Sequence, residues 1–446
     1  MHHQDEDGAS SFSPGSPASP VSHRESWITM SRSGHARWYA ILPAVFWQCC
    51  GVAMVLPILP RVKADFFGGD VQTATRVNGA AEAMNAVLTM VVTPELGSLS
   101  DGVGRKPLMI AALSGSLLPI LCLVCSSDMW LYFAAFALSG IFGNQMVLFN
   151  AYIADTSKEA ERSRRFGVTN AVVGTSLLVA PVLGASVQGF AGTRATFVVA
   201  ASLSALSVAS MWCVPESLPR DRRRRPRVRL SLESLVLPMR DFSRKADARM
   251  WLWFCVYFWR GCMTEGYVTI SLFAMQAIVP GWTNGDNGIF LILIGGGVML
   301  AQGVFLPCLT GVLTDQSLAL IAQGVDVLGS VAMVVQLSLC PSWKYSILLV
   351  FGLSSLTEWF DAVGSKLIVS GREEDLGLVF GAFGALSAFT SVVTPLAFAS
   401  AFAVSAIAVF WVICFCNCAA MMALVLALRR PCSRLPASLP LMAPEA

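Results

Sequence analysis

Histidine is nearly absent from this chain of 446 residues, and the few that occur lie within the first 35 positions: His2, His3, His23 and His35. The rest of the chain therefore lacks the side chain that most often acts as a general base or a metal ligand at neutral pH. It also lacks the Gly-x-x-x-x-Gly-Lys-Ser/Thr loop that cradles nucleotide phosphates. These absences argue against a catalytic triad, a zinc site and ATP-driven pumping. We therefore predict no enzyme, no metal and no cofactor.

Charged side chains are also scarce, because they make up 13% of the chain, about half of the usual share in a soluble domain. Hydrophobic residues make up 55% and form apolar runs of about twenty residues, the length that crosses a bilayer. The basic residues lie in loops beside these runs, so no nucleic acid is expected as a partner. The 13 cysteines lie mostly inside the runs, which favours reduced thiols over disulfides.

The apolar runs predict an all-α membrane protein with twelve transmembrane helices in two six-helix, pseudo-symmetric halves. The predicted spans are 38–59, 74–96, 107–126, 129–153, 166–190, 194–214, 250–276, 287–309, 317–338, 345–369, 377–400 and 404–428. Polar composition predicts a disordered tail over residues 1–36, without a signal peptide. The halves cover 37–214 and 250–428. A basic linker, 215–249, joins them, and a tail, 429–446, follows.

Lysine and arginine are divided unevenly between the two sides that these spans define. With both termini inside, the inside segments hold 24 of the 31 basic residues, including the run Arg222–Arg225 in the linker. The basic residues of the outside segments are Arg61, Lys63, Arg76, Arg194 and Lys344. Inside loops of membrane proteins carry an excess of Lys and Arg, so we predict that both termini are cytoplasmic.

A short polar island separates the second and third apolar runs. It follows the pattern Gly-x-Leu-x-Asp-x-x-Gly-Arg-Lys, with Gly97, Leu99, Asp101, Gly104, Arg105 and Lys106 at the defined positions. The glycines allow two helix ends to turn within a few residues and to approach closely. The carboxylate of Asp101 can pair with Arg105 or face a helix N-terminus.

A second copy of the island occurs 214 residues later, at Gly311, Leu313 and Asp315. The same offset relates three further pairs: Glu161 and Asp375, Gly167 and Gly381, and Pro181 and Pro395. One register held over about eighty residues predicts two homologous halves, as in transporters built from parallel repeats.

Small residues and a proline mark the predicted fifth span: Gly167, Gly174, Pro181 and Gly184. The polar island resembles the loop between spans two and three of the major facilitator superfamily. The fifth span, and Val214–Pro219 at the end of span six, resemble its drug:proton antiporters, tetracycline exporters and hippocampus-abundant-transcript proteins. In those families the fifth-span residues form the antiporter signature, but Ala180 and Ala185 stand where it usually has glycine. Close helix packing in a bundle explains the same residues equally well.

Polar side chains at membrane depth are costly, and each is a candidate for a substrate or proton site. Those near the middle of a predicted span are Arg260, Glu265, Glu358, Asp361, Asn144, Gln145 and Gln48. Glu358 and Asp361 are three residues apart, which predicts one shared helix face. In the superfamily, spans one, four, seven and ten line the central cavity, so the resemblance implies that these groups converge there. An ion pair that only locks the bundle, such as Arg260 with Glu358, is the alternative.

Other residues separate this chain from the proton-coupled members of the superfamily. Their usual acid in span one and arginine in span four are both missing. Glu82 lies toward the outer end of span two, and we expect Asp326, on a span that is usually peripheral, to be a structural partner.

The function that these observations favour is secondary transport of a small organic solute by alternating access. By resemblance, Asp101 and Asp315 latch the cytoplasmic side. A carboxylate in an apolar cavity is costly to ionise, which makes Glu265, Glu358 and Asp361 candidates for proton coupling. Two alternatives stay open, a facilitative uniporter for a sugar-like solute and a transport-inactive receptor or sorting protein. We expect a monomer in a lipid bilayer.

Overall fold

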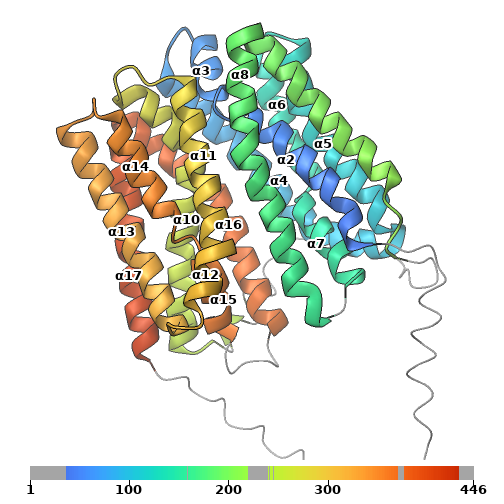
Figure 1. Ribbon diagram of the computed structural model, residues 1–446, viewed down its shortest axis with the longest axis vertical. Coiled ribbons are helices and arrows are strands. Elements are labelled where there is room, and N and C mark those ends of the chain that lie inside the picture. Colours follow the sequence, from blue (N-terminus) through green and yellow to red (C-terminus); the bar gives the residue numbers. More distant parts are fainter. Residues whose placement is uncertain are drawn as a thin grey trace, which may run out of the picture.

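The computed structural model describes residues 37–157, 159–218, 240, 242–244, 246–369 and 376–430. Within these residues the chain is largely helical and contains no β-strand. The predicted tails and most of the linker, with Arg222–Arg225 and also Asp375, lie outside them. In Figure 1 the helices fall into a first group, coloured blue to green, and a second group beside it, coloured yellow to red.

The first group extends from Trp38 to Cys213. Its helices are η1 (Trp38–Ile41), α2 (Leu42–Val55), α3 (Leu59–Phe66), α4 (Val71–Val103), α5 (Arg105–Cys125), α6 (Met129–Ser139), η2 (Gly140–Phe142), α7 (Gln145–Asp155) and α8 (Glu159–Cys213). The last of these consists of two helices joined at Gly192, whose φ of +82° favours glycine. The predicted spans 166–190 and 194–214 therefore meet at this residue.

The second group extends from Ala248 to Arg429. Its helices are α10 (Ala248–Ile278), α11 (Asn284–Leu300), η4 (Ala301–Phe305), α12 (Leu306–Leu309), α13 (Asp315–Leu339), α14 (Lys344–Ser355), α15 (Phe360–Val369), α16 (Leu376–Val404) and α17 (Ala408–Arg429). The segment η4 is a π-helix that continues α11. Among all described residues, eight helices are long and apolar enough to cross a membrane.

Three of the predicted spans are interrupted in the structure. The first is broken between α2 and α3, next to Pro57. The fourth is broken between α6 and α7, where Gly143 has a φ of +66° and Asn144 caps α7 by accepting from the Met146 N–H (2.9 Å). The tenth is broken by a turn at Leu356–Trp359. Interrupted helices leave polar backbone groups at membrane depth, which is tolerated where protein surrounds them.

The two groups meet along a seam formed by α4 against α16 and by α8 against α11. Glycines allow the close approach, because a Cβ at Gly79 would lie 2.9 Å from the Pro395 carbonyl oxygen. A Cβ at Gly295 would lie 3.0 Å from the Cβ of Leu177. Small residues at helix contacts are the usual means of close packing between membrane helices.

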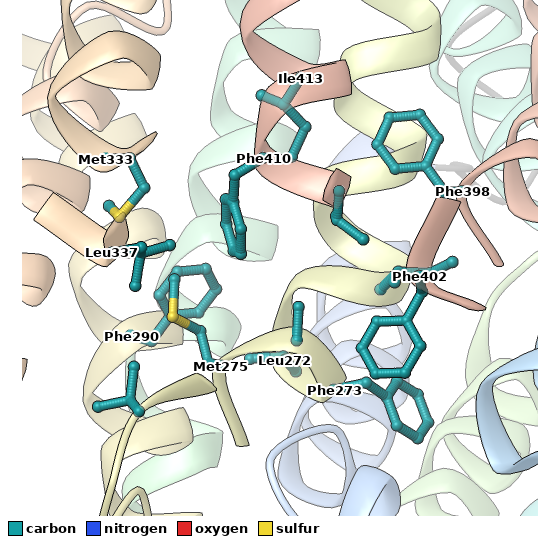
Figure 2. Close-up of a cluster of buried hydrophobic side chains, with 14 of the residues drawn as sticks. Leu272, Phe273, Met275, Phe290, Met333, Leu337, Phe398, Phe402, Phe410 and Ile413 are labelled. Carbon is teal, nitrogen blue, oxygen red and sulfur yellow. The ribbon is translucent and has the colours of Figure 1, made fainter. Parts of the chain in front are cut away.

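A buried apolar cluster fills the second group and surrounds α10. Figure 2 shows side chains from α10, α11, α13, α16 and α17 pointing toward one another, including Phe290, Phe398 and Phe410. The ring centroids of Phe290 and Phe351 are 4.5 Å apart in an edge-to-face arrangement. Aromatic pairs of this kind contribute packing beyond their buried area. The cluster therefore fixes the wall of the cavity described next.

Candidate functional site

Arg260 lies near the middle of α10 and is only 5% exposed. Its guanidinium donates to Asp326 (2.7 Å) and to Gln323 (2.9 Å), both on α13. It also lies 3.8 Å from an oxygen of Asp361 and 4.1 Å from the ring centroid of Phe360. Arg260 therefore pairs with Asp326 and Asp361, and the pairing with Glu358 that the sequence suggested as an alternative is wrong.

Glu358 lies in the turn between α14 and α15 and faces a cavity. Among the described residues its carboxylate forms no hydrogen bond or ion pair, although Arg260 and Asp326 are near enough to interact electrostatically. Asp361, by contrast, begins α15 with its side chain 78% exposed. The prediction that these two acids share one helix face is wrong, because the turn at Leu356–Trp359 interrupts the helix between them.

The cavity has a volume of about 230 Å³ and lies inside the second group. It is lined by residues of α10, α11, α13, α14 and α17 and of the turn after α14, and no described residue of the first group contributes to it. Its wall is mostly apolar and aromatic, with Tyr267, Phe351 and Phe410 beside the acids. Within the described part of the chain, no three His, Cys, Asp or Glu side chains are arranged to hold a metal ion.

The polar candidates of the first group stay within that group. Gln48 is 1% exposed and donates to Ser116 (2.8 Å), whose hydroxyl donates to Gln145 (3.4 Å). The side-chain oxygen of Gln48 has no hydrogen-bond partner among the described residues. Asn144 is exposed and serves as the cap of α7. The structure thus does not bring these residues into the cavity that Glu358 faces.

A second set of buried charges, the seam cluster, lies at the contact between the groups. Lys63 of α3 is 5% exposed, donates to Asn78 and lies 5.1 Å from the ring centroid of Tyr132. Asn78 in turn donates to Glu82 (2.9 Å), both on α4. The other carboxylate oxygen of Glu82 is buried and has no hydrogen-bond partner among the described residues.

Glu265 extends the seam cluster into the second group. It accepts a hydrogen bond from Ser391 of α16 (2.7 Å) and interacts electrostatically with Glu82. Ser391 lies one helical turn from Pro395, the residue that contacts Gly79 across the seam. Acids from both groups therefore meet at this level of the seam.

Sequence reasoning assigned Lys63 to an outside loop and missed its burial. The helix break next to Pro57 starts the short helix α3, which turns Lys63 back into the bundle. A signal was present in span two, where Asn78 and Glu82 are four residues apart and so share one face. That polar face requires a partner, and the cations near it in the sequence are Arg61, Lys63 and Arg76.

The polar island lies at the junction of α4 and α5. Gly104 has a φ of +119°, a conformation that favours glycine. Arg105 forms an ion pair with Asp155 at the end of α7 (3.0 Å), and Glu216 accepts from the backbone N–H groups of Arg105 (2.9 Å) and Lys106 (3.2 Å). A carboxylate at a helix N-terminus is favourable, so Glu216 caps α5.

The structure describes the remaining positions of the island and its copy only in part. Leu99 is half-buried, and the surroundings of Gly97 and Asp101 lie outside the described part of the structure. In the copy, Gly311 is exposed in a turn, Leu313 packs against a buried apolar cluster, and Asp315 begins α13.

The small residues of α8 contact two different helices. A Cβ at Gly184 would lie 2.4 Å from the Met54 carbonyl oxygen of α2. Gly174 and Pro181 face α11, whereas Gly167 is exposed and a Cβ there would meet nothing within 4 Å. Three of the four predicted packing residues therefore lie at helix contacts.

Comparison with known proteins gives relatives along most of the chain. The tetracycline resistance protein, class C, of Escherichia coli is 25% identical over 380 residues, covering 82% of this chain and 89% of that protein. Hippocampus abundant transcript-like protein 1 of Homo sapiens is 27% identical over 256 residues, covering 56% of this chain. The match covers 50% of that relative, so the chain spans about half of its length.

Two solved structures share the fold. The human organic anion transporter MFSD10 aligns with a TM-score of 0.62 at 18% identity, covering 87% of this chain and 98% of that one. The nucleoside transporter NupG aligns with a TM-score of 0.67 at 12% identity, covering 88% and 100%. The family model described as Major Facilitator Superfamily matches residues 41–357, which confirms the resemblance of the polar island. Because that match covers well over half of the chain, the protein belongs to the Major Facilitator Superfamily of multi-pass membrane transporters.

Proposed function

We propose that this chain is a secondary transporter that carries a small organic solute by alternating access. The observation that carries the proposal is the seam cluster, in which Glu82 of the first group, linked to Lys63 through Asn78, interacts electrostatically with Glu265 of the second. In a contact that always stays closed, buried charges stabilise the protein no more than well-packed apolar residues would. Charges on opposite sides of an opening seam exchange partners as it opens, which suits a moving part.

The hydrogen bonds across the seam support an inward-facing form. At the end that carries α3, Asn287 donates to the Pro57 carbonyl (2.7 Å) and Asn284 donates to Gln188 (3.4 Å). At the opposite end, the described hydrogen bonds of Lys106 and Asp155 remain within the first group and the segment directly after α8. We propose that the end with α3 is the closed, outer end.

Two six-helix halves, 37–214 and 250–428, with twelve spans in total, form part of the proposal. The interrupted spans support it, since Asn144 and Glu358 lie at the two breaks and are 214 residues apart. This is the offset that relates the two copies of the polar island. Matching breaks in matching spans are expected where one ancestral half was duplicated.

We further propose that both chain termini and the linker 215–249 are cytoplasmic, because this orientation places 24 of 31 basic residues inside. A protease site inserted within Arg222–Arg225 tests the orientation in sealed vesicles of known sidedness. Cleavage is expected only when the protease has access to the cytoplasmic face. Cleavage from the other face alone would reverse the orientation and, with it, the assignment of the outer end.

Solute flux in reconstituted vesicles tests the function itself. The names of the relatives include tetracycline resistance, organic anion transport and nucleoside transport, so drugs, organic anions, nucleosides and sugars are compared side by side. We expect one class to accumulate when a proton gradient is applied. Saturable uptake that does not respond to the gradient would favour the uniporter. The absence of both flux and a ligand-induced thermal shift would favour the receptor.

In the same assay, Asp101→Asn is expected to slow flux if Asp101 and Asp315 form the cytoplasmic latch.

A further inference from the structure

We propose that the cavity inside the second group is a binding site for a small organic cation, separate from the solute path along the seam. The ligand is an amine that is protonated at neutral pH, on an apolar body about the size of one aromatic ring. Binding does not depend on the transport proposal, because it is measured on the purified protein without a membrane gradient.

The position of the cavity separates it from the seam. Among the described residues, its lining comes from helices of the second group and the turn after α14, with no contribution from Glu265 or from the first group. A rigid movement of the two groups apart would therefore not uncover a ligand held there. At about 230 Å³ the cavity is smaller than the 300–1,000 Å³ typical of pockets for drug-sized ligands. A compact ligand with a single ring fits this volume.

The charge around the cavity favours a cation. Three acids, Asp326, Glu358 and Asp361, lie around the single guanidinium of Arg260. Arg260 is already engaged by Asp326 at 2.7 Å and by Gln323 at 2.9 Å. The carboxylate of Glu358 faces the cavity and has no hydrogen-bond or ion-pair partner among the described residues. A partly buried carboxylate without a partner is costly in an apolar wall, and a bound ammonium group would supply one.

The backbone adds to this preference. Helix α14 ends at Ser355, which lines the cavity, so the negative end of its dipole reaches the same wall as Glu358. Ends of interrupted helices at membrane depth commonly bind cations in transporters. Here the helix end and the carboxylate are independent features that favour the same charge.

The aromatic lining selects the kind of cation. Tyr267, Phe351 and Phe410 line the cavity, and the rings of Tyr267 and Phe351 are 5.1 Å apart. Aromatic faces attract organic cations and bury an apolar body, whereas an inorganic ion would remain without most of its hydration shell. The site therefore fits an aryl-alkyl or alkyl ammonium ion better than a sodium ion.

The cavity also touches a part of the fold that an occupant would brace. Gln302, in the π-helix η4, donates to the backbone carbonyl of Glu358 (3.1 Å). The turn that carries Glu358 is thus tied to an irregular segment of the neighbouring helix. A ligand paired with Glu358 is expected to hold both segments in place, and so to raise the thermal stability of the protein.

Equilibrium binding of radiolabelled 2-phenylethylamine to the purified full chain in detergent tests the proposal. The neutral isostere 2-phenylethanol serves as competitor, with thermal unfolding as a second measurement. We expect the amine to bind and stabilise the protein and the alcohol to compete at least about tenfold more weakly. Glu358→Gln, which keeps the shape of the side chain, is expected to weaken amine binding by a similar factor.

Three further variants separate this site from its alternatives. Ser330→Leu places bulk in the cavity without changing its charge and is expected to block binding, which keeps the test valid if Glu358→Gln fails to fold. Asp361→Asn removes an exposed charge from the same cluster, and Glu265→Gln a charge from the seam. Both are expected to retain binding. Equal affinity for amine and alcohol, or loss of binding in Glu265→Gln with retention in Glu358→Gln and Ser330→Leu, would overturn the proposal.

Discussion

Glutamine in place of Glu265 is expected to abolish gradient-driven accumulation of the solute while sparing solute exchange across the same vesicles. In the closed seam, Glu82 interacts electrostatically with both Lys63 and Glu265. Two neighbouring carboxylates repel each other when both are charged, and a shared proton removes that repulsion. In the proposed transport cycle, opening of the seam separates the acids and releases the proton on the other side. Glutamine keeps the hydrogen-bonding geometry with Ser391 but removes this proton step.

The other two predicted acids provide matched controls in the same vesicles. Asp361 has an exposed side chain, and Asp361→Asn is expected to keep accumulation near the wild-type level. Glu358 faces the cavity of the second group, away from the seam, so the pH dependence of flux in Glu358→Gln tests whether it shares the proton step. If all three single variants retain wild-type accumulation and pH dependence, these acids are structural. The uniporter or the receptor would then replace the coupled transporter.

Methionine in place of Arg260 is expected to lower the free energy of unfolding by about 3–5 kcal/mol, the range seen when one partner of a buried ion pair is removed. Arg260 is the cation that Asp326 contacts at 2.7 Å, and it also offsets the charges of Asp361 and Glu358. Without it, Asp326 would be left as a charge in an apolar interior. Chemical or thermal unfolding of the purified variant measures the loss.

A second substitution distinguishes loss of charge balance from loss of packing. Adding Asp326→Asn to Arg260→Met removes the stranded charge and is expected to restore a large part of the stability. If the double variant is no more stable than the single one, the damage comes from the space that the guanidinium filled against Phe360. If Arg260→Met alone is as stable as the wild type, the ion pair does not hold this part of the fold together.

Several of the predicted helical spans agree with the structure because their signal is local. Apolar runs, capping residues and glycines can be recognised without knowing the neighbours of a helix, and α5 and α13 begin and end within a few residues of the predicted 107–126 and 317–338. The break in the fourth span also has a local signal in the sequence, since Gly140, Gly143 and Asn144 disfavour a continuous helix. The break at Leu356–Trp359 contains neither glycine nor proline, so its cause is tertiary.

The pairing of the charged residues could not be predicted for the same reason. Spacing along one helix indicates which side chains share a face, but it does not indicate which helix lies opposite. Arg260 meets Asp326 because α10 and α13 are neighbours around α17 in the folded second group. Lys63 was missed because its burial depends on the direction of the short helix α3. The polar island, by contrast, was recognisable because its glycines and charges act within ten residues of one another.

The turn at Leu356–Trp359 also determines where the tenth span opens first in solution. Its backbone bonds run from Leu356, Thr357 and Glu358 to carbonyls three residues earlier, at 3.3, 3.2 and 3.4 Å. Such bonds are longer and less well aligned than those of an α-helix, so they break more easily. In heavy water these amides should exchange before those of α14 and α15 on either side. Deuterium would then enter this span from its middle outward, whereas an uninterrupted helix exchanges from its frayed ends inward.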